Sequence, residues 1–419
     1  MNTITTNADD IQQELKKMVR AQKEAPGFAM NSYFYRSNAV FKRELDRLIF
    51  RSWMYAAHVS EIPESGNYVL LEVGEDSIII ARDQDGKVQA LHNICRHRGS
   101  RVCEHQSGKR KTFVCPYHGW SYNLDGTLRP ARNMEVLEGF DRNNFSLKSI
   151  SVEVYMGLIF VNFNSAAPAF TLSLDKIKQP LGAYKLQNAK VVHQNTYKVN
   201  ANWKLCLENY LECYHCASSH KKYSRIHTLK DLSCNVSHLN DAMLARAEEI
   251  TGVKGIGNEH EQVYLKATDF GSCVASNRYA LYDGYLTGSE DGQAIAPLMG
   301  NMKGYDGGAG DFQMGPVTFM LNYPDHCVLY RFLPRGLTET DMKVVWFVNG
   351  DAEEGVDYNI EKLTWLWHET TQEDEYIIMR NSEGVNSKFF SPGPYHPEHE
   401  ALCIKFVEWY LSILDDELT

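Results

Sequence analysis

Residues 95–120 read CRHRGSRVCEHQSGKRKTFVCPYHGW, which is the most informative pattern in the chain. A Cys-x-His half, formed by Cys95 and His97, precedes a Cys-x-x-His half, formed by Cys115 and His118. Short β-rich runs flank each half, so each is expected on the tip of a hairpin. Two such tips can close on a metal site from opposite sides.

The presence of one cysteine and one histidine in each half indicates which kind of metal site this is. Two thiolates and two imidazoles also suit a structural zinc ion, but zinc sites usually pair like residues within each half. In a Rieske [2Fe–2S] cluster two thiolates hold one iron and two imidazoles hold the other. Each loop must then supply one ligand to each iron, so we predict this cluster, with zinc as the alternative. Cys103 and His105 fall outside the spacing and are interpreted as bystanders.

Short β-rich runs extend around this pattern from residue 67 to residue 163. The runs YVLLEV, SIIIAR, KVQALHN and GLIFVNF are predicted strands, and Asp-Gly pairs at 85–86 and 125–126 indicate hairpin turns. Two helices, at 9–23 and 38–50, are expected before this region. Beyond the AAPA linker at 166–169 the pattern predicts helices at 202–215 and 356–381, and strands at 191–200, 317–323, 327–334 and 343–350.

These patterns predict an α+β chain in which a small all-β domain is inserted near the start of a larger domain. The expected boundaries are a helical segment at 1–52 that packs on the larger domain, the β domain at 53–165, and the larger domain at 166–419.

Composition excludes several classes of protein. Hydrophobic residues at 43% and charged residues at 23% are typical of a globular protein. A net charge of -10 offers no basic stripe for a phosphate backbone, so nucleic acid is not an expected partner, whereas a cationic substrate is compatible with it. The polar N-terminal sequence, the scattered cysteines and the absence of a long apolar run predict a cytoplasmic protein without a membrane span or disulfide framework.

A second group of metal-ligating residues lies in NWKLCLENYLECYHCASSH, residues 202–220, which contains His215 and His220. Two histidines and one carboxylate hold Fe(II) in non-haem oxygenases and leave positions open for dioxygen. Five residues turn a helix by about 140°, so both side chains reach one metal only if the helix ends or distorts between them. Two helical histidines are also common as ordinary surface or core residues, and the pair alone does not establish a site.

The third ligand is expected on the predicted helix at 356–381, which contains Glu373, Asp374 and Glu375. Asp374 falls on the apolar face of this helix, where a buried carboxylate needs a partner. Its two neighbours fit a solvated acidic turn better. The nearby Cys213 and Cys216 form a Cys-x-x-Cys pattern, but no thioredoxin-like βαβ frame surrounds it, so a redox role is not expected.

The two motifs, in this order and separation, resemble the Rieske ring-hydroxylating and demethylating oxygenases over nearly the whole chain. The resemblance implies a Rieske domain set into a helix-grip catalytic domain. It implies Cys95, His97, Cys115 and His118 as cluster ligands, and it implies an iron site formed by His215, His220 and Asp374.

The family usually forms α3 rings, in which the cluster of one subunit supplies electrons to the iron of the next. A carboxylate three residues before the first iron-binding histidine links the two centres. It is aspartate in most relatives and Glu212 here. Glutamate in an NYLECYHC context, with SPGPYHPEHEALCIKFVEWYL at 391–411, is similar to the subgroup that oxidises carnitine, glycine betaine and proline betaine.

This subgroup implies that the chain hydroxylates an N-methyl group of a small quaternary ammonium compound, which then loses formaldehyde. Dioxygen is the co-substrate, and NAD(P)H supplies electrons through a separate flavin and iron–sulfur reductase. Aromatic faces suit such a cation, and Phe319, Tyr323 and Phe332 are the candidate substrate residues. The alternatives are a hydroxylase of aromatic acids, an electron-transfer protein that carries only the cluster, and a zinc-stabilised binding module.

Overall fold

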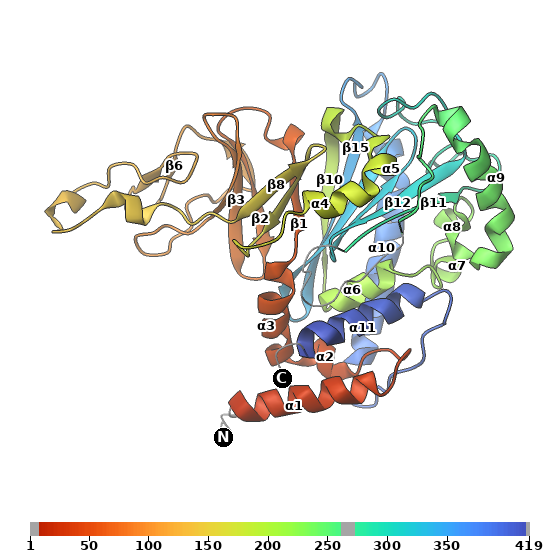
Figure 1. Cartoon of the computed structure of the whole chain (residues 1–419), viewed down its shortest axis with the longest axis horizontal. Coiled ribbons are helices and arrows are strands. Elements are labelled where there is room, and N and C mark those ends of the chain that lie inside the picture. Colours follow the sequence, from red (N-terminus) through yellow and green to blue (C-terminus); the bar gives the residue numbers. More distant parts are fainter. Residues whose placement is uncertain (1–7, 261–272, 416–419) are drawn as a thin grey trace.

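The computed structural model describes residues 8–260 and 273–415. Within residues 8–165, nine strands form small antiparallel sheets, on the left of Figure 1. The sheet orders are β1-β9-β8, β4-β3-β2-β5 and β6-β7. The strands are β1 Met54–His58, β2 Asn67–Val73, β3 Asp76–Arg82, β4 Val88–His92, β5 Ser107–Lys109, β6 Phe113–Val114, β7 Ser121–Tyr122, β8 Ser151–Tyr155 and β9 Leu158–Asn162.

The two Asp-Gly turns lie where the sequence predicts them. Gly86 has φ +79° and Gly126 has φ +88°, a region that glycine enters without steric cost. The backbone N–H of Asn123 donates to the carbonyl of Thr127 at 2.9 Å and closes the second turn. A Cβ on Gly126 would lie 2.9 Å from the Leu91 side chain, so the turn also needs glycine for close packing.

A six-stranded antiparallel sheet forms the centre of the larger domain, with the order β10-β15-β14-β13-β12-β11. The four predicted strands of this domain are confirmed, whereas β11 and β12 were not predicted. The strands are β10 Ala189–Val199, β11 Val274–Ala280, β12 Gly308–Met314, β13 Thr318–Asn322, β14 Cys327–Gly336 and β15 Glu339–Asn349.

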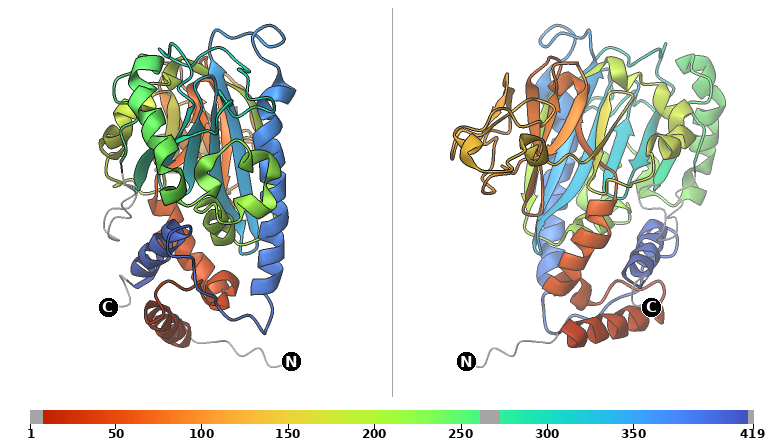
Figure 2. Two further views of the ribbon diagram at one scale, coloured as in Figure 1. Left: turned by 90° about the vertical axis from the view of Figure 1, so that its right-hand side faces the viewer. Right: turned by 60° about the vertical axis from the view of Figure 1, so that its left-hand side comes forward.

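Helices cover this sheet, and α1, α2 and α11 close one end of the molecule (Figures 1 and 2). The longest, α10, begins at Ile360 because the Asn359 side chain accepts a hydrogen bond from Lys362 N–H, so the predicted start at residue 356 is wrong. None of the helices in the described ranges has the length and apolar character to cross a bilayer. The helices are α1 Ala8–Lys23, α2 Ser32–Arg36, α3 Asn38–Arg47, α4 Thr171–Leu174, α5 Lys178–Gly182, α6 Trp203–Tyr210, α7 Cys216–Ser219, α8 Lys221–Ser224, α9 Ser233–Thr251, α10 Ile360–Val385 and α11 Ala401–Asp415.

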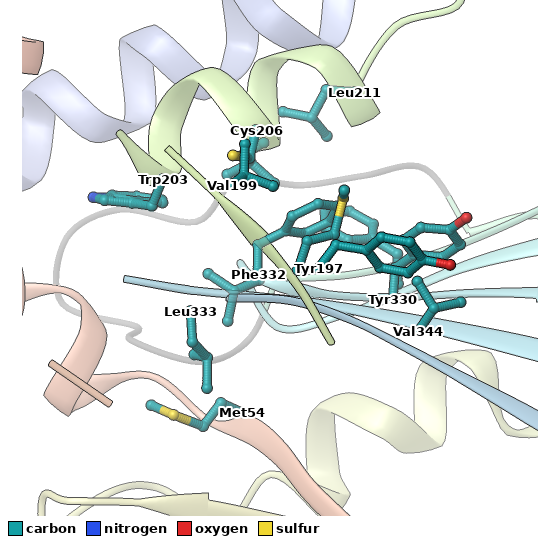
Figure 3. Packing of buried hydrophobic residues seen from close by; sticks show 14 of the residues in the cluster. Met54, Tyr197, Val199, Trp203, Cys206, Leu211, Tyr330, Phe332, Leu333 and Val344 are labelled. Atoms are coloured by element: carbon teal, nitrogen blue, oxygen red, sulfur yellow. The ribbon is translucent and has the colours of Figure 1, made fainter. Parts of the chain in front are cut away.

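Helix α6 packs on strands β14 and β15 of the large sheet. In Figure 3, Cys206 of α6 lies above Phe332 of β14, and Trp203 of α6 and Tyr330 of β14 lie to either side. The same core continues to Met54 in β1, so the small and large sheets share apolar packing. This packing therefore fixes the position of α6, and of the chain that follows it, relative to β14.

A buried ion pair ties α6 to both ends of the described chain. Lys204 Nζ lies 2.6 Å from Glu44 Oε1, and both side chains are fully buried. Trp203 Nε1–H also donates to Glu44, at 2.9 Å, and the Tyr410 hydroxyl donates to the same carboxylate. Since Glu44 lies on α3 and Tyr410 on α11, one carboxylate connects three helices.

We expect Lys204→Met to destabilise the protein strongly, because it keeps the side-chain volume but leaves the Glu44 carboxylate buried without its cation. Removing one partner of a buried pair costs about 3–5 kcal/mol. The measurement is the urea midpoint of unfolding. The double variant Lys204→Met/Glu44→Gln should recover part of the loss, and a single variant with an unchanged midpoint would contradict the assignment.

Candidate metal centres and substrate cavity

The two Cys/His loops of the small domain have the same backbone architecture. Cys95 N–H donates to Ser100 O, and Gly99 N–H donates to Cys95 O. The second loop repeats both bonds, from Cys115 N–H to Trp120 O and from Gly119 N–H to Cys115 O. Gly99 and Gly119 have φ +79° and +73°, so each loop needs glycine after its histidine.

The four side chains of these loops converge. The Cys95 and Cys115 thiols are buried and in contact with each other, and the Nδ1 atoms of His97 and His118 lie 3.1 Å apart. Imidazole nitrogens that bind one metal at about 2.1 Å lie about 3.0–3.4 Å apart. The arrangement could therefore hold a two-iron cluster, with cysteines inside and exposed histidines outside. Burial raises the pKa of the Cys95 thiol.

Neighbouring aromatic rings fix the orientation of the two imidazoles. The Trp120 ring stacks on His97 with centroids 4.9 Å apart, and Tyr117 stacks on His118 at 3.9 Å. The Tyr122 hydroxyl lies 3.3 Å from Cys95 Sγ. Cys103, interpreted as a bystander, is buried beside Tyr68, and burial raises the pKa of its thiol to about 12.

In the larger domain three ligand atoms form a small triangle. His215 Nε2 and His220 Nε2 lie 3.0 Å apart, and Asp374 Oδ1 lies 3.3 Å and 2.9 Å from them. Ligands at right angles and about 2.1 Å from a metal are separated by about 3.0 Å. Two histidines and one carboxylate on one face are the donor set of mononuclear Fe(II) oxygenases. The residues therefore fit an iron ion, and the opposite face of the triangle remains open to the cavity.

Two further carboxylates are hydrogen-bonded to the Nδ1 atoms of these imidazoles, on the side away from the triangle. Glu212 Oε1 lies 2.5 Å from His215 Nδ1, and Glu373 Oε2 lies 2.9 Å from His220 Nδ1. A proton on each Nδ1 leaves Nε2 free to bind a metal and fixes the ring plane. The prediction that Glu373 belongs to a solvated turn is thus wrong. His220 has only 1% of its side chain exposed, so its Nδ1–H needs a hydrogen-bond acceptor within the protein. Glu373 provides that acceptor.

The chain between the two histidines departs from a regular helix, as predicted. Helix α6 ends at Tyr210, however, so the predicted helix at 202–215 is too long. The Glu212 carboxylate accepts backbone N–H groups of Tyr214 and His215, which starts a new turn. His215 and His220 then lie at the two ends of the short helix α7.

A disulfide joins Cys213 and Cys216 across this turn. The sequence predicted no disulfide framework, and this single local bond was not predicted. The fold brings the two sulfurs together because the turn that aims His215 folds the chain back within one Cys-x-x-Cys unit. The bond needs no thioredoxin-like frame.

Negative charge dominates the electrostatics of this triangle. Burial lowers the pKa of His215, but hydrogen bonds to Asp374 and Glu212 outweigh it and raise the pKa to about 9. Burial likewise opposes ionisation of Asp374, and the two imidazoles hold the pKa of its carboxyl below the usual value. Three carboxylates around two imidazoles therefore favour a cation at their centre.

A cavity of about 710 Å³ opens on this triangle. Phe319 lines it, as predicted, but Tyr323 and Phe332 do not, and for these two the prediction is wrong. The Tyr323 hydroxyl is hydrogen-bonded to His227 Nε2 at 2.6 Å, and the Phe332 ring packs 5.4 Å from Tyr210 inside the core. Tyr323 and Phe332 therefore pack behind the residues that line the cavity.

The cavity also contains a carboxylate that the sequence analysis did not select. Asp311 is the charged residue of strand β12 and lines the cavity, and burial raises its pKa to about 7. Tyr210 and Tyr223 lie close enough that, after burial, the charge of Asp311 further raises their pKa values. The Tyr223 ring also lies 6.3 Å from the His220 ring, so one tyrosine is near both Asp311 and the iron triangle. A single acidic residue in a buried strand was the available signal.

Family models match both parts of this architecture. The model of the Rieske [2Fe-2S] domain matches residues 52–141, and the model of the ring hydroxylating alpha subunit catalytic domain matches residues 186–416. The chain belongs to the Rieske ring-hydroxylating oxygenases. It is therefore an oxygenase with a [2Fe–2S] domain and a mononuclear-iron catalytic domain, which acts on a small molecule with electrons from a reductase.

Similar Rieske oxygenases include enzymes named for quaternary ammonium substrates. The glycine betaine monooxygenase oxygenase subunit of Pseudomonas aeruginosa is 33% identical over 386 residues, which are 91% of this chain and 88% of the relative. The carnitine monooxygenase oxygenase subunit of Escherichia coli is 34% identical over 197 residues, 46% of this chain and 52% of the relative.

Solved structures of Rieske oxygenases share the fold. The quaternary ammonium Rieske monooxygenase CntA with L-carnitine superposes with a TM-score of 0.69 at 20% identity, covering 93% of this chain and 96% of that one. Naphthalene 1,2-dioxygenase from a Rhodococcus species gives 0.68 at 18% identity, covering 98% and 99%. Because both substrate classes share this fold, the fold itself does not select between them.

We expect Asp374→Ala to remove the mononuclear iron and to leave the visible spectrum of the cluster unchanged, because the two sites lie in different domains. Glu373→Ala should weaken iron binding about 10- to 100-fold, since it releases the His220 ring. Iron analysis after dialysis against a chelator measures both. Glu375→Ala is the matched control and should retain iron; loss of iron from Glu375→Ala but not from Asp374→Ala would refute the geometry.

Proposed function

We propose that this Rieske oxygenase hydroxylates an N-methyl group of a small quaternary ammonium compound and thereby demethylates it. In this proposal Cys95, His97, Cys115 and His118 hold the cluster, and His215, His220 and Asp374 hold the iron. A betaine or a carnitine-like molecule is the proposed substrate. The names of the similar enzymes and the residues that line the cavity both support this substrate.

Asp311 is the observation that carries the substrate proposal. A desolvated carboxylate is costly unless a cation or hydrogen-bond donors compensate it. None of the described residues that line the cavity is a lysine or an arginine. A quaternary ammonium group would supply the missing positive charge. It cannot donate a hydrogen bond, so a carboxylate with aromatic faces around it suits its chemistry.

The aromatic rings around Asp311 suit the same cation. The rings of Tyr210 and Phe319 lie 4.5 Å apart, and those of Tyr223 and Trp367 lie 5.7 Å apart. Each ring presents negative charge on its face. Because Tyr223 lies near both Asp311 and His220, an ammonium group bound here would lie close to the open face of the triangle. An apolar aromatic substrate would instead bury Asp311 without compensation.

The reaction balances for such a substrate. One atom of dioxygen enters a C–H bond of the N-methyl group and the other leaves as water, with two electrons and two protons consumed. The N-hydroxymethyl product then breaks its C–N bond, so that formaldehyde and a proton leave and a tertiary amine remains. A ring hydroxylation would release no formaldehyde.

When bound, the cluster supplies single electrons and the mononuclear iron supplies the oxygen chemistry. The residues of this chain bind, orient and shield. Glu212 and Glu373 retain a proton on each Nδ1, so that both Nε2 atoms stay unprotonated at the iron site. Asp311 and the tyrosines hold the cation, and the apolar wall of Phe319 and Leu321 limits access of water.

Assembly as a ring of three subunits is part of this proposal. His97 and His118 are exposed at the tip of the small domain, near the exposed Tyr117, so the tip is suited to contact another subunit. Glu212 lies behind His215 with 12% of its side chain exposed. It could accept a hydrogen bond from an exposed histidine of the neighbouring tip and so connect the cluster of one subunit to the iron of the next.

We expect the purified protein, given a reductase, NADH and oxygen, to release one formaldehyde per coupled turnover with a quaternary ammonium substrate. The panel contains glycine betaine, carnitine, proline betaine, choline, benzoates and phthalates. In Asp311→Asn, which keeps the volume but removes the charge, the KM for the active ammonium compound should rise at least about tenfold. Formaldehyde and amine product are quantified together.

The matched control is Asp231→Asn. Asp231 lines the same cavity, but its carboxylate already accepts the Tyr282 hydroxyl, so the change in KM should stay within about threefold. Product formed only from the aromatic acids, without formaldehyde, would replace the demethylase by a ring hydroxylase. An unchanged KM in Asp311→Asn would remove Asp311 from the substrate site.

We also expect Glu212→Gln to lower turnover about 10- to 100-fold while both metal sites remain filled, because glutamine loses the charge that holds the His215 proton. Stopped-flow spectroscopy of pre-reduced enzyme mixed with oxygen and substrate should show that the cluster stays reduced. Glu212→Asp, which keeps the carboxylate, should restore part of the rate. Normal cluster oxidation in Glu212→Gln would disprove the bridge.

A further inference from the structure

A basic groove lies on the small domain, away from the iron cavity. Four cationic side chains surround an open hollow of about 700 Å³ at the ends of β5 and β7. The whole chain has a net charge of -10, so this concentration of positive charge runs against its composition. We call this hollow the basic groove. Its lining residues are Ser65, Gln84, Lys109, Arg110, Lys111, Asn123, Leu124 and Arg129.

Most of the positive charge in the basic groove is not neutralised within the chain. Lys109 Nζ pairs with the exposed Glu64 carboxylate. Arg129 Nη1–H donates only to the neutral amide oxygen of Asn123, at 3.3 Å. Over residues 8–260 and 273–415, the salt bridges include none that involves Arg110, Lys111 or Arg129. All three side chains are exposed and available to an anionic partner.

The β6–β7 hairpin connects the basic groove to the proposed cluster site. Its turn carries Cys115 and His118, whereas Lys111 and Asn123 lie at its open end, next to the pairing of Phe113 with Tyr122. The four residue-to-residue steps from Lys111 to Cys115 span at most about 13 Å even when fully extended. The groove and the exposed histidines therefore lie at opposite ends of one short hairpin.

Tyr122 connects the wall of the basic groove to a cysteine of the proposed cluster site. Leu124, on the groove wall, follows Tyr122 by two residues, and the Tyr122 hydroxyl touches Cys95 Sγ at 3.3 Å. The same hydroxyl accepts the Arg96 backbone N–H at 3.0 Å. A partner seated in the groove would thus lie near the chain segment that contacts Cys95, while His97 and His118 remain exposed at the tip.

We propose that the basic groove is the docking surface for the reductase, which presents an acidic face to it. The inference goes beyond the substrate proposal, and it uses from that proposal only the placement of the cluster and the contact of its tip with a neighbouring subunit. If the tip contacts the neighbour, the electron donor must bind elsewhere, and the opposite end of the hairpin lets both partners bind together. Each encounter transfers one electron, so the reductase is oxidised and the oxygenase is reduced by one electron.

Charge complementarity is the argument for an acidic partner. Opposite charges on two protein surfaces raise the rate of encounter and fix the orientation, and salt screens this effect. A rapid, reversible contact suits a donor that must bind for each electron. A small phosphate-bearing molecule is the other chemistry that three free cations could attract, and the experiment separates it from a protein.

The test uses Arg110→Glu/Lys111→Glu in the full-length protein with its cluster. The probe is a flavin and iron–sulfur reductase that supports turnover of the wild-type protein. At low salt, the Kd of the variant for the reductase should rise at least tenfold. The rate of reductase-driven cluster reduction, followed by bleaching without substrate at subsaturating reductase, should fall by a similar factor. Both differences should disappear at high salt, where the wild-type interaction is screened.

Two controls keep the result specific. Lys16→Glu/Lys17→Glu changes the net charge equally on the exposed face of α1 and should leave the Kd within twofold of wild type. Reduction of every variant by dithionite with methyl viologen should proceed at the wild-type rate, which shows that the cluster site is intact. If Arg110→Glu/Lys111→Glu fails to retain its cluster, Arg110→Gln/Lys111→Gln replaces it, with an expected rise in Kd of at least threefold.

Three outcomes would overturn the proposal. These are an unchanged Kd in the groove variant, an equal loss in the α1 control, and binding of inorganic phosphate in the groove with no effect on reductase binding. None depends on the substrate, because binding and cluster reduction are measured without one. Failure of the substrate proposal is therefore distinguishable from failure of this one.

Discussion

The contact of the Asp374 carboxylate with two imidazole nitrogens is the interaction on which the rest of the structure depends. Its atoms come from α10 and from the irregular segment after α6, which are far apart in the sequence. They meet because α6 packs on β14 and β15 and α10 packs on both α6 and β10. Any one of these atoms alone would be an unfavourable buried polar group. Their convergence is favourable with a divalent cation at the centre, so the sheet and its helices form a rigid frame for one ion.

The two proposed metal centres differ in their burial and in the charge of their surroundings. The iron triangle is buried and surrounded by carboxylates, with Glu212 and Glu373 behind its histidines. The cluster loops are short, glycine-dependent turns on the surface, with aromatic rings rather than carboxylates beside His97 and His118. The first arrangement concentrates negative charge to keep a cation. The second leaves its histidines accessible, as a relay requires.

Sequence patterns predicted the parts of the fold that depend on local spacing. The Asp-Gly turns, the long strands β10, β14 and β15, and the break between His215 and His220 all follow from periodicity or turn chemistry. Contacts between distant elements could not be predicted in this way. Glu373 was misjudged because its acceptor role exists only beside His220, and Asp311 was overlooked because its strand, β12, was not recognised. Tyr323 follows a strand whose Phe319 does line the cavity, but its hydroxyl binds His227 instead.

The contacts of the Glu44 carboxylate affect the order in which parts of the chain can fold during synthesis. It joins Lys204 and Trp203 to Tyr410, so α6 is fully anchored only after α11 has been synthesised. All loops of the small domain, which is matched over residues 52–141, have been synthesised well before α11. Domains generally fold as they emerge, the first one first. The cluster loops can therefore fold early, whereas α6, and with it the segment that carries His215 and His220, gains its last anchor only from α11.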